Sequence, residues 1–222
     1  MAGATAPHAG QPVVAMGAPL GEGRVVVIAI HGRGAGPRNI LDLAPLIGNA
    51  QVTFLAPAAL GGTWYPKGFM APVEDNEPGI TSAIAVVHAL IDEAGARGVP
   101  TERIVLMGFS QGACLSVTAA QRRPARYGGV LVYSGGLIGP PGTQWSTAGD
   151  FAATPVFLGC SDVDGHIPAE RVRASAAHLE AMGAAVTLRL YPGMGHTIND
   201  EEVAFGRDLL AELAASRTDA RG

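Results

Sequence analysis

The sequence predicts an α/β fold in which a mostly parallel central sheet is flanked by helices on both faces. Short apolar runs closed by Gly or Pro alternate with longer segments in which apolar residues recur every three or four positions. The runs are apolar throughout, which is typical of parallel strands buried on both sides. With 222 residues, 48% of them hydrophobic, and no repeat or linker, the chain is expected to form one compact domain.

The predicted strands are β-branched or aliphatic runs. In chain order they are Val25–Ile30, Val52–Leu55, Arg103–Met107, Gly129–Tyr133, Pro155–Leu158 and Val186–Leu190. The first twenty residues contain three prolines and have no basic start, which is unlike a secretory segment. We therefore expect a loose N-terminal arm over residues 1–20 and an α/β domain over residues 21–222.

Four segments are predicted to be helices. The first starts at Gly79, has apolar residues at helical spacing, and ends near Gly95 and Gly98. The others are Gln111–Gln121, Ala169–Met182 and Glu201–Ala215. Asn199 or Asp200 can cap the last of them. Each helix carries an apolar stripe that would face the sheet.

Two long segments, Pro57–Pro78 and Ser134–Thr154, have no periodicity and are rich in Gly and Pro. Loops of this length in an α/β domain usually form the walls of a functional site. Their large apolar residues are candidates for a substrate pocket, with packing onto the core as the alternative: Trp64, Tyr65, Phe69, Met70, Leu137 and Ile138.

Charge and cysteine usage narrow the functional classes. The net charge is −4 and no run of Lys or Arg could follow a phosphate backbone, so we expect no nucleic-acid partner. No eighteen apolar residues run without Gly, Pro or charge, so no stable membrane insertion is expected. Cys114 and Cys160 lie far apart in apolar contexts, which favours free thiols and a cytoplasmic location.

A candidate nucleophile follows the predicted strand Arg103–Met107. Gly108-Phe109-Ser110-Gln111-Gly112 is a G-x-S-x-G sequence between a strand and a helix, the context in which this turn exposes a serine above the sheet. Glycines on either side let strand and helix approach closely. The alternative is a serine that only satisfies its own tight turn.

A serine hydroxyl needs a base that is itself oriented by a carboxylate, and in this arrangement the chain order is Ser, acid, His. His196 lies in a Gly-rich turn after the last predicted strand, where the base belongs, although it could instead cap the following helix. For the acid, Asp162 and Asp164 both follow the end of a strand. Their spacing leaves the choice between them open.

The oxyanion of an acyl-transfer intermediate needs backbone donors. The N–H of Gln111, directly after the nucleophile, is one of them. A second would come from the Gly-rich segment after the first predicted strand, from Arg33 or a neighbour.

No cofactor and no metal are expected. The Gly32-x-Gly34 pair suggests a dinucleotide fingerprint, but Pro37 stands at the third glycine position. Asp162-x-Asp164-Gly165 suggests a calcium loop, but the remaining ligands are missing at the required spacing. Histidines, carboxylates and cysteines show no metal-ligand spacing.

Together these motifs resemble the phospholipase/carboxylesterase family of α/β-hydrolases, to which the acyl-protein thioesterases belong. The resemblance runs from about Val25 to the last helix and rests on five motifs: His31-Gly32-x-Gly34, Gly108-Phe109-Ser110-Gln111-Gly112, Tyr133-Ser134-Gly135, Asp162-x-Asp164-x-x-Ile167-Pro168 and Gly195-His196. Arg33 stands where eukaryotic thioesterases usually carry Leu. The chain is more similar to the bacterial esterase branch.

The resemblance implies a single-domain α/β-hydrolase with Ser110 as nucleophile and His196 as base. It implies Asp164 as the acid, because the family uses the second aspartate of this motif, and the amides of Arg33 and Gln111 as oxyanion donors. The expected activity is hydrolysis of short-to-medium-chain carboxylic esters, with thioesters or lysophospholipids as further substrates. The alternatives are a lactonase resembling dienelactone hydrolase and a non-catalytic ligand-binding protein. A small-molecule ester is the expected partner, and whether a homodimer forms stays open.

Overall fold

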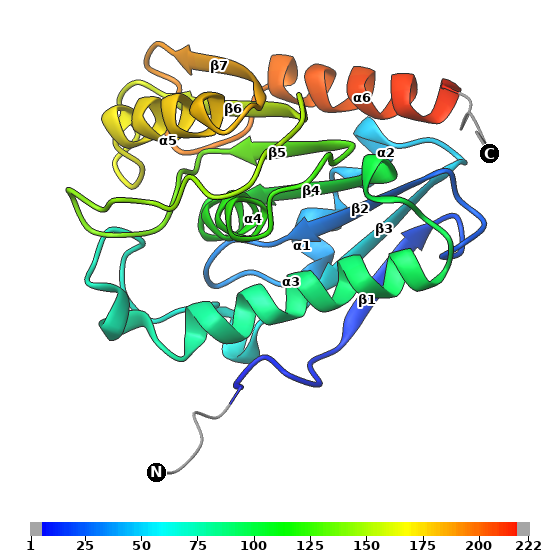
Figure 1. Cartoon of the computed structure of the whole chain (residues 1–222), viewed down its shortest axis with the longest axis horizontal. Helices are drawn as coiled ribbons and strands as arrows, with labels where there is room; N and C mark the ends of the chain where they lie inside the picture. Colours follow the sequence, from blue (N-terminus) through cyan, green and yellow to red (C-terminus); the bar gives the residue numbers. More distant parts are fainter. Residues whose placement is uncertain (1–5, 217–222) are drawn as a thin grey trace.

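The structure is a computed structural model and describes residues 6–216 of the chain. Within this range the strands are β1 Val13–Gly17, β2 Val25–Ile30, β3 Val52–Pro57, β4 Ile104–Phe109, β5 Gly129–Tyr133, β6 Pro155–Ser161 and β7 Ala185–Tyr191. They form one sheet in the order β1-β3-β2-β4-β5-β6-β7 (Figure 1). Every neighbouring pair is parallel except β1 with β3.

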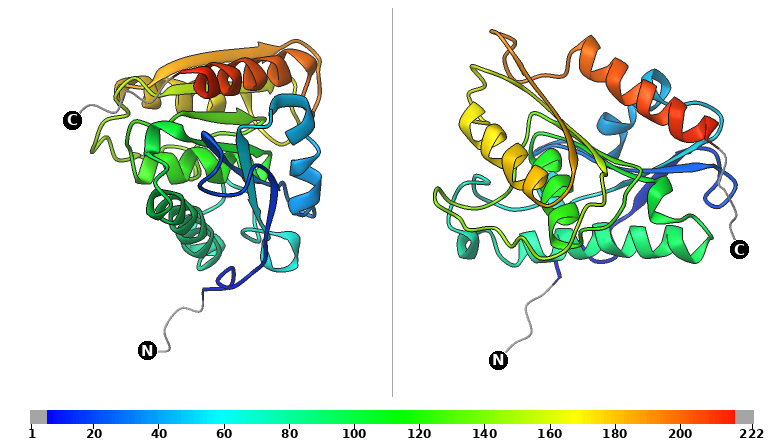
Figure 2. Two further views of the ribbon diagram at one scale, coloured as in Figure 1. Left: turned by 90° about the vertical axis from the view of Figure 1, so that its right-hand side faces the viewer. Right: turned by 45° about the horizontal axis from the view of Figure 1, so that its top comes forward.

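Helices cover both faces of this sheet (Figures 1 and 2). One face is covered by α3 Gly79–Ala96, α4 Gln111–Arg122 and α5 Ala169–Ala181, and the other by α1 Pro37–Leu41, α2 Ala44–Ile47 and α6 Asp200–Ala215. Short 3-10 turns occur at η1 Leu60–Gly62, η2 Val73–Asn76 and η3 Thr101–Arg103. The predicted α/β class with a mostly parallel sheet is confirmed.

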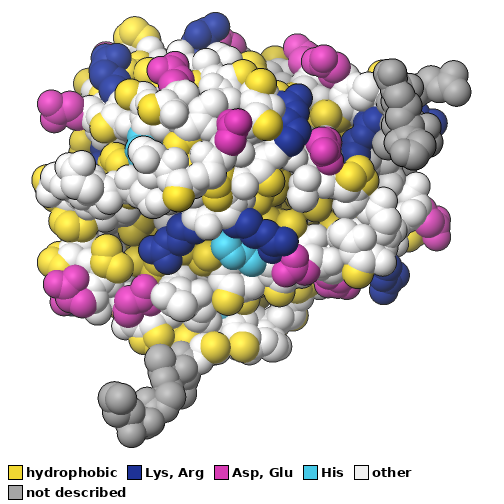
Figure 3. Space-filling view, viewed as in Figure 1, with side chains coloured by type: hydrophobic (Ala, Val, Ile, Leu, Met, Phe, Trp, Pro, Cys, Tyr) yellow, Lys and Arg dark blue, Asp and Glu magenta, His cyan; other side chains and the backbone are white. Residues whose placement is uncertain are grey.

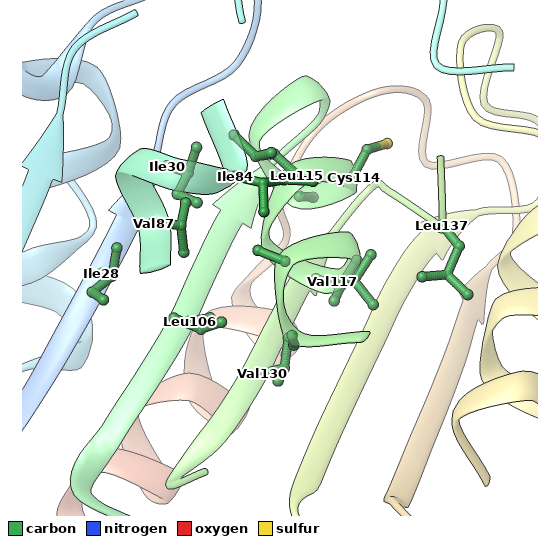
Figure 4. Packing of buried hydrophobic residues seen from close by; sticks show 14 of the residues in the cluster. Ile28, Ile30, Ile84, Val87, Leu106, Cys114, Leu115, Val117, Val130 and Leu137 are labelled. Carbon is green, nitrogen blue, oxygen red and sulfur yellow. The ribbon is translucent and has the colours of Figure 1, made fainter. Parts of the chain in front are cut away.

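Two apolar cores fill the space between sheet and helices. Successive residues of a strand point to opposite faces, so Ile28 packs under α3 and α4 while Val27 packs under α1 and α6. Figure 4 shows the first core, where Ile84 and Val87 of α3 lie against the strands. Strands buried on both sides explain why the runs in the sequence are apolar without alternation.

The strand β1 lies within the predicted N-terminal arm, so the arm is more ordered than expected. Val13 pairs with Pro57 and Gly17 with Thr53, which adds an antiparallel strand at the edge of the sheet. Most of β1 is exposed, and its four apolar residues, Val13–Met16, form only a short run within a segment rich in Gly and Pro. Residues 1–5 of the arm and 217–222 of the predicted domain lie outside the described residues.

Among the helices within residues 6–216, α3 is the one whose length and hydropathy would allow it to cross a membrane. Half of it is buried in the protein, where Ile80, Val87 and Ile91 join the core. These are the properties of a core helix. On the molecular face that carries α3, basic and acidic side chains are interspersed (Figure 3).

Candidate active site

Ser110 stands at the sharp turn between β4 and α4, at the carboxyl edge of the sheet. Its backbone has φ +56° and ψ −120°, a conformation that L-residues rarely adopt. The Ser110 amide donates to the Tyr133 carbonyl at 3.0 Å, which ties the turn to β5. A Cβ on Gly108 would lie 2.3 Å from the Gly112 oxygen, and one on Gly112 would lie 2.0 Å from the Ile30 oxygen. Only glycine fits at either position, as the turn requires.

A continuous chain of hydrogen bonds joins three of the predicted site residues. His196 Nε2 lies 2.8 Å from Ser110 Oγ, and His196 Nδ1 lies 2.7 Å from Asp164 Oδ2. The Asp164 side chain is fully buried, whereas 21% of the His196 side chain is exposed to the cleft. Because a carboxylate can only accept, Nδ1 carries the proton and Nε2 is free to accept from the serine.

The Asp164 carboxylate has further donors. Its Oδ1 accepts from the amides of His166 at 2.8 Å and Ile167 at 3.0 Å. Burial raises the pKa of this carboxyl, but the hydrogen bonds from His196 and from the two amides outweigh it, so the pKa lies below its ordinary value. The group beside His196 is therefore an anion at neutral pH.

Asp162 has a different position. Its Oδ1 accepts from the Gly193 amide at 2.8 Å, and Ser161 Oγ accepts from the Gly195 amide at 3.1 Å. These two side chains fix the loop that carries His196 to the end of β6. The structure thus brings Asp164 to the imidazole and leaves Asp162 as a support for the loop, a distinction that the spacing of the two aspartates could not make.

Two aromatic rings flank the His196 imidazole. The Phe109 ring lies 4.9 Å from it between centroids, and the His166 ring lies 4.8 Å away in an edge-on orientation. Sequence reasoning did not assign a role to either residue. Their positions, one before the serine and two after the aspartate, were the only available signal.

The helix that follows His196 begins at a buried capping box. The Glu202 amide donates to Asn199 Oδ1 at 3.0 Å, and the Asn199 amide donates to Glu202 Oε2 at 2.9 Å. Burial raises the pKa of the Glu202 carboxyl to about 7, despite the hydrogen bond from Asn199. Its Oε1 has no donor among the described residues and lies against Gly159, where a Cβ would be 2.1 Å away.

The two residues predicted to supply oxyanion donors, Arg33 and Gln111, line the cleft together with Ser110. Gln111 is the first residue of α4, so its amide has no acceptor one turn earlier and lies at the positive end of the helix dipole. The Arg33 amide has no hydrogen-bond acceptor among the described residues. Its neighbour Gly34, at φ +72°, donates to the Gly62 oxygen at 2.8 Å, which holds the loop in place.

The side chains of the same two residues hold the loop after β3. Gln111 Oε1 accepts from the Trp64 amide at 2.9 Å, and its Nε2 donates to the Tyr65 oxygen at 2.8 Å. The Arg33 guanidinium donates to the carbonyls of Pro66, at 2.8 Å, and Lys67. The turn at Ser110 and the loop that carries Arg33 are therefore both joined to the wall of the cleft by direct hydrogen bonds.

Trp64 is buried behind this wall between two histidines. Its ring centroid lies 5.2 Å from that of His8 and 5.0 Å from that of His31, and its indole N–H donates to the His31 oxygen at 2.9 Å. The amides of Leu60 and Ala59 donate to His8 Nδ1 and His31 Nε2, both at 3.1 Å, so each imidazole is neutral. Burial lowers the pKa of both histidines.

A cleft of about 580 Å³ opens in front of Ser110 and His196. Of the six predicted pocket residues, Tyr65 and Phe69 line it. The other four do not: Trp64, Leu137 and Ile138 are buried in the core, and Met70 packs against it. For these four the alternative, packing onto the core, is the correct one.

The second long loop, which carries Leu137 and Ile138, turns inward because its backbone is hydrogen-bonded to buried side chains. Arg171 donates to the carbonyls of Leu137 at 2.8 Å and Gly139 at 2.6 Å, and Thr118 Oγ1 accepts from the Ile138 amide at 3.1 Å. The same guanidinium lies 5.7 Å from the Phe69 ring centroid. Cys114, Leu43, Leu46 and Ile198 line the cleft instead, and sequence reasoning missed them.

Within residues 6–216, no group of three or more His, Cys, Asp or Glu side chains could hold a metal ion. Cys114 and Cys160 are both free and buried.

Comparisons with known proteins point to one family. The model of a family described as phospholipase/carboxylesterase matches residues 13–213. A probable carboxylesterase of Oryza sativa subsp. japonica is 28% identical over 221 residues, covering 91% of this chain and 93% of the rice protein. Acyl-protein thioesterase 1 of Gibberella zeae is 35% identical over 137 residues, which is 59% of this chain and 56% of the fungal protein. A second probable rice carboxylesterase is matched over only 51% of its length.

The solved structures agree with this result. A phospholipase/carboxylesterase from Dyadobacter fermentans has a TM-score of 0.86 and 37% sequence identity, covering 90% of this chain and 96% of that one. The Bacillus cereus carboxylesterase has a TM-score of 0.72 at 18% identity, covering 92% and 95% of the two chains, and shares the fold.

Proposed function

Because the chain belongs to the phospholipase/carboxylesterase family, we propose that it is a serine carboxylesterase that acts on short-to-medium-chain esters. Ser110 is the nucleophile, His196 the general base and acid, and Asp164 the group that orients the imidazole. One observation carries the proposal: the hydrogen bonds of 2.8 and 2.7 Å that run from Ser110 through His196 to Asp164 at the mouth of the cleft.

In the first half-reaction His196 Nε2 takes the Ser110 proton as Oγ attacks the ester carbonyl. The amides of Arg33 and Gln111 donate to the oxyanion of the tetrahedral intermediate. A donor of this kind contributes about 3 to 4 kcal/mol to transition-state stabilisation. Asp164 holds Nδ1–H and stabilises the imidazolium that forms. His196 then gives its proton to the departing alcohol, and the acyl group stays on Ser110.

In the second half-reaction water takes the place of the alcohol. His196 removes a proton from the water, hydroxide attacks the acyl-enzyme, and Ser110 leaves with the proton that His196 returns. The Phe109 and His166 rings keep the imidazole aligned through both steps. The product is a free carboxylic acid, and the enzyme is restored without a cofactor.

The substrate range follows from the size and polarity of the cleft. A volume of about 580 Å³ lined by Tyr65, Phe69 and Ile167 fits an acyl chain of moderate length better than a headgroup with many polar atoms. Thioesters and lysophospholipids are further substrates of the same chemistry. We also propose a cytoplasmic location, consistent with two free, buried thiols.

The test is hydrolysis of p-nitrophenyl esters from acetate to palmitate by the purified full chain. We expect turnover that is highest for short or medium acyl chains and abolished by Ser110→Ala. Ser116→Ala makes the same chemical change six positions along, where the hydroxyl donates only to the Gly112 oxygen, and should keep turnover within a few-fold.

The alternatives make different predictions. A folded wild-type protein that turns over no ester, and whose Ser110 is not labelled by a fluorophosphonate probe, would be a non-catalytic ligand-binding protein. A protein that is labelled but hydrolyses only lactones would be a lactonase of the dienelactone-hydrolase type. Either result would contradict the proposed esterase.

A further inference from the structure

The cleft reaches both faces of the sheet, because Ser110 stands at the edge between them. Four lining residues belong to the core under α3 and α4 and form what we call the Tyr65 arm: Tyr65, Phe69, Cys114 and Ile167. Five others lie on the side of α1, α2 and α6 and form what we call the α1–α2 arm: Ile40, Leu43, Leu46, Phe109 and Ile198. Ser110 lines the same cleft as both arms.

The position of His196 distinguishes the two arms chemically. The alcohol oxygen must receive its proton from His196 Nε2, so the alcohol departs on the imidazole side of the serine. Phe109 of the α1–α2 arm packs on this ring at 4.9 Å, and Ile198 of the same arm follows His196 two positions later. The ring is also contacted by His166, at 4.8 Å between centroids. The Tyr65 arm lies instead beside α4, whose first amide is the Gln111 oxyanion donor.

We propose that the α1–α2 arm binds the alcohol part of the ester and makes the enzyme selective for apolar alcohols that carry no negative charge, while the Tyr65 arm binds the acyl part. This inference rests on the proposed function and specifies its substrate class. Leu46 lines this arm and is 53% exposed. Its exposed apolar surface does not contribute to the core, which is typical of a binding site. Asp42 is the carboxylate among the lining residues, at this same end, and would repel an anionic alcohol.

The chemistry determines where the preference appears. In acylation the bond between the carbonyl carbon and the alcohol oxygen breaks, the alcohol leaves with the His196 proton, and the acyl group stays on Ser110. Esters of one acid with different alcohols therefore give the same acyl-enzyme. Alcohol length must change kcat/KM, and it leaves kcat unchanged when deacylation limits turnover.

The experiment compares propyl butyrate with hexyl butyrate, whose alcohols have the same acidity and differ by three methylenes. A methylene moved completely from water onto apolar surface strengthens binding about four-fold, and an open cleft that covers half of it about two-fold. We therefore expect kcat/KM to be about eight-fold higher for the hexyl ester.

Substitutions in each arm show which of the two arms causes the hexyl-to-propyl ratio of kcat/KM. Leu46→Gln should lower the hexyl-to-propyl ratio to about two-fold, and Ile198→Ala, in the same arm, should also lower it. Leu60→Gln is the matched control, because Leu60 is likewise 53% exposed but does not line the cleft. Phe69→Ala, in the Tyr65 arm, should change the dependence on acyl length across a series of propyl esters and not the hexyl-to-propyl ratio. Urea midpoints check that each variant is folded.

Failure of this inference can be distinguished from failure of the proposed esterase function. Turnover of both butyrates at equal kcat/KM would overturn the inference while leaving the esterase intact. So would a ratio that Leu60→Gln or Phe69→Ala lowers as much as Leu46→Gln does. If neither ester is hydrolysed and a fluorophosphonate does not label Ser110, the proposed function fails, and the inference fails with it.

Discussion

Replacing the buried carboxyl of Glu202 by an amide should make the protein more stable at alkaline pH. Burial raises the pKa of this group from 4.5, the ordinary value of a glutamate, to about 7 in the folded protein. A raised pKa means that the folded state binds a proton that the unfolded chain has released, so stability is lost as pH rises from 4.5 through about 7. The difference of about 2.5 units corresponds to about 3 kcal/mol, most of it lost between about pH 5 and about pH 8.

Glu202→Gln keeps a side-chain carbonyl oxygen that can accept from the backbone N–H of Asn199, and it removes the negative charge. We expect the free energy of unfolding, measured by urea titration at about pH 5 and about pH 8, to fall with pH by about 2 to 3 kcal/mol less in the variant than in the wild type. The matched control is Glu201→Gln, one position earlier, where the side chain is 63% exposed and pairs with Arg189. An exposed pair of this kind contributes less than about 1 kcal/mol.

The comparison isolates the carboxyl because His8 and His31 titrate in the wild type and in both variants alike. An identical pH dependence of stability in the wild type and Glu202→Gln would refute the reasoning. It would mean that the buried carboxylate is stabilised as well in the folded protein as in water.

Two further predictions concern the site. Asp164→Asn should lower kcat about 10³- to 10⁴-fold, because an amide at this place favours the wrong tautomer of His196. Asp162→Asn should act mainly on stability. Equal losses of activity in the two variants would contradict the assignment of Asp164 as the acid. The pKa values of His8 and His31 are lowered in the folded state, so their contribution to stability is complete above about pH 6.5 and is lost as pH falls below it, by at most about 1.4 kcal/mol per pH unit for each histidine. In urea titrations, His8→Gln should make the free energy of unfolding fall less steeply as pH drops below about 6.5, and an unchanged slope would count against it.

The parts of the fold that the sequence predicted are those with a strong local signal. Buried parallel strands such as Val25–Ile30 are apolar throughout, and the turn at Ser110 needs glycines at two fixed positions. The edge strand β1 has only a short apolar run, Val13–Met16, most of which is exposed, and its pairing depends on β3, some forty residues later. Long-range pairing of this kind is not encoded locally.

The walls of the cleft were the hardest part to predict. Leu137 and Phe69 are both apolar residues in long loops and both join the core, yet only Phe69 also lines the cleft. What separates them is the position of a distant side chain: Arg171 binds the Leu137 carbonyl and its guanidinium lies against the Phe69 ring. Leu46 and Ile198, which line the opposite side, come from a short helix and a short turn that carry no apolar periodicity.

The hydrogen bonds from Gln111 to the loop at Trp64 and Tyr65 affect how the substrate range of such an enzyme can change in evolution. Its amide side chain binds only main-chain atoms, the N–H of residue 64 and the carbonyl of residue 65. The identity of the side chain at position 65 can therefore change without disturbing the contact, whereas an insertion or deletion that separates this N–H from this carbonyl would break it. Point substitutions in this wall can alter substrate range over successive generations while the reacting atoms stay in register, and Gln111 itself has little freedom to vary.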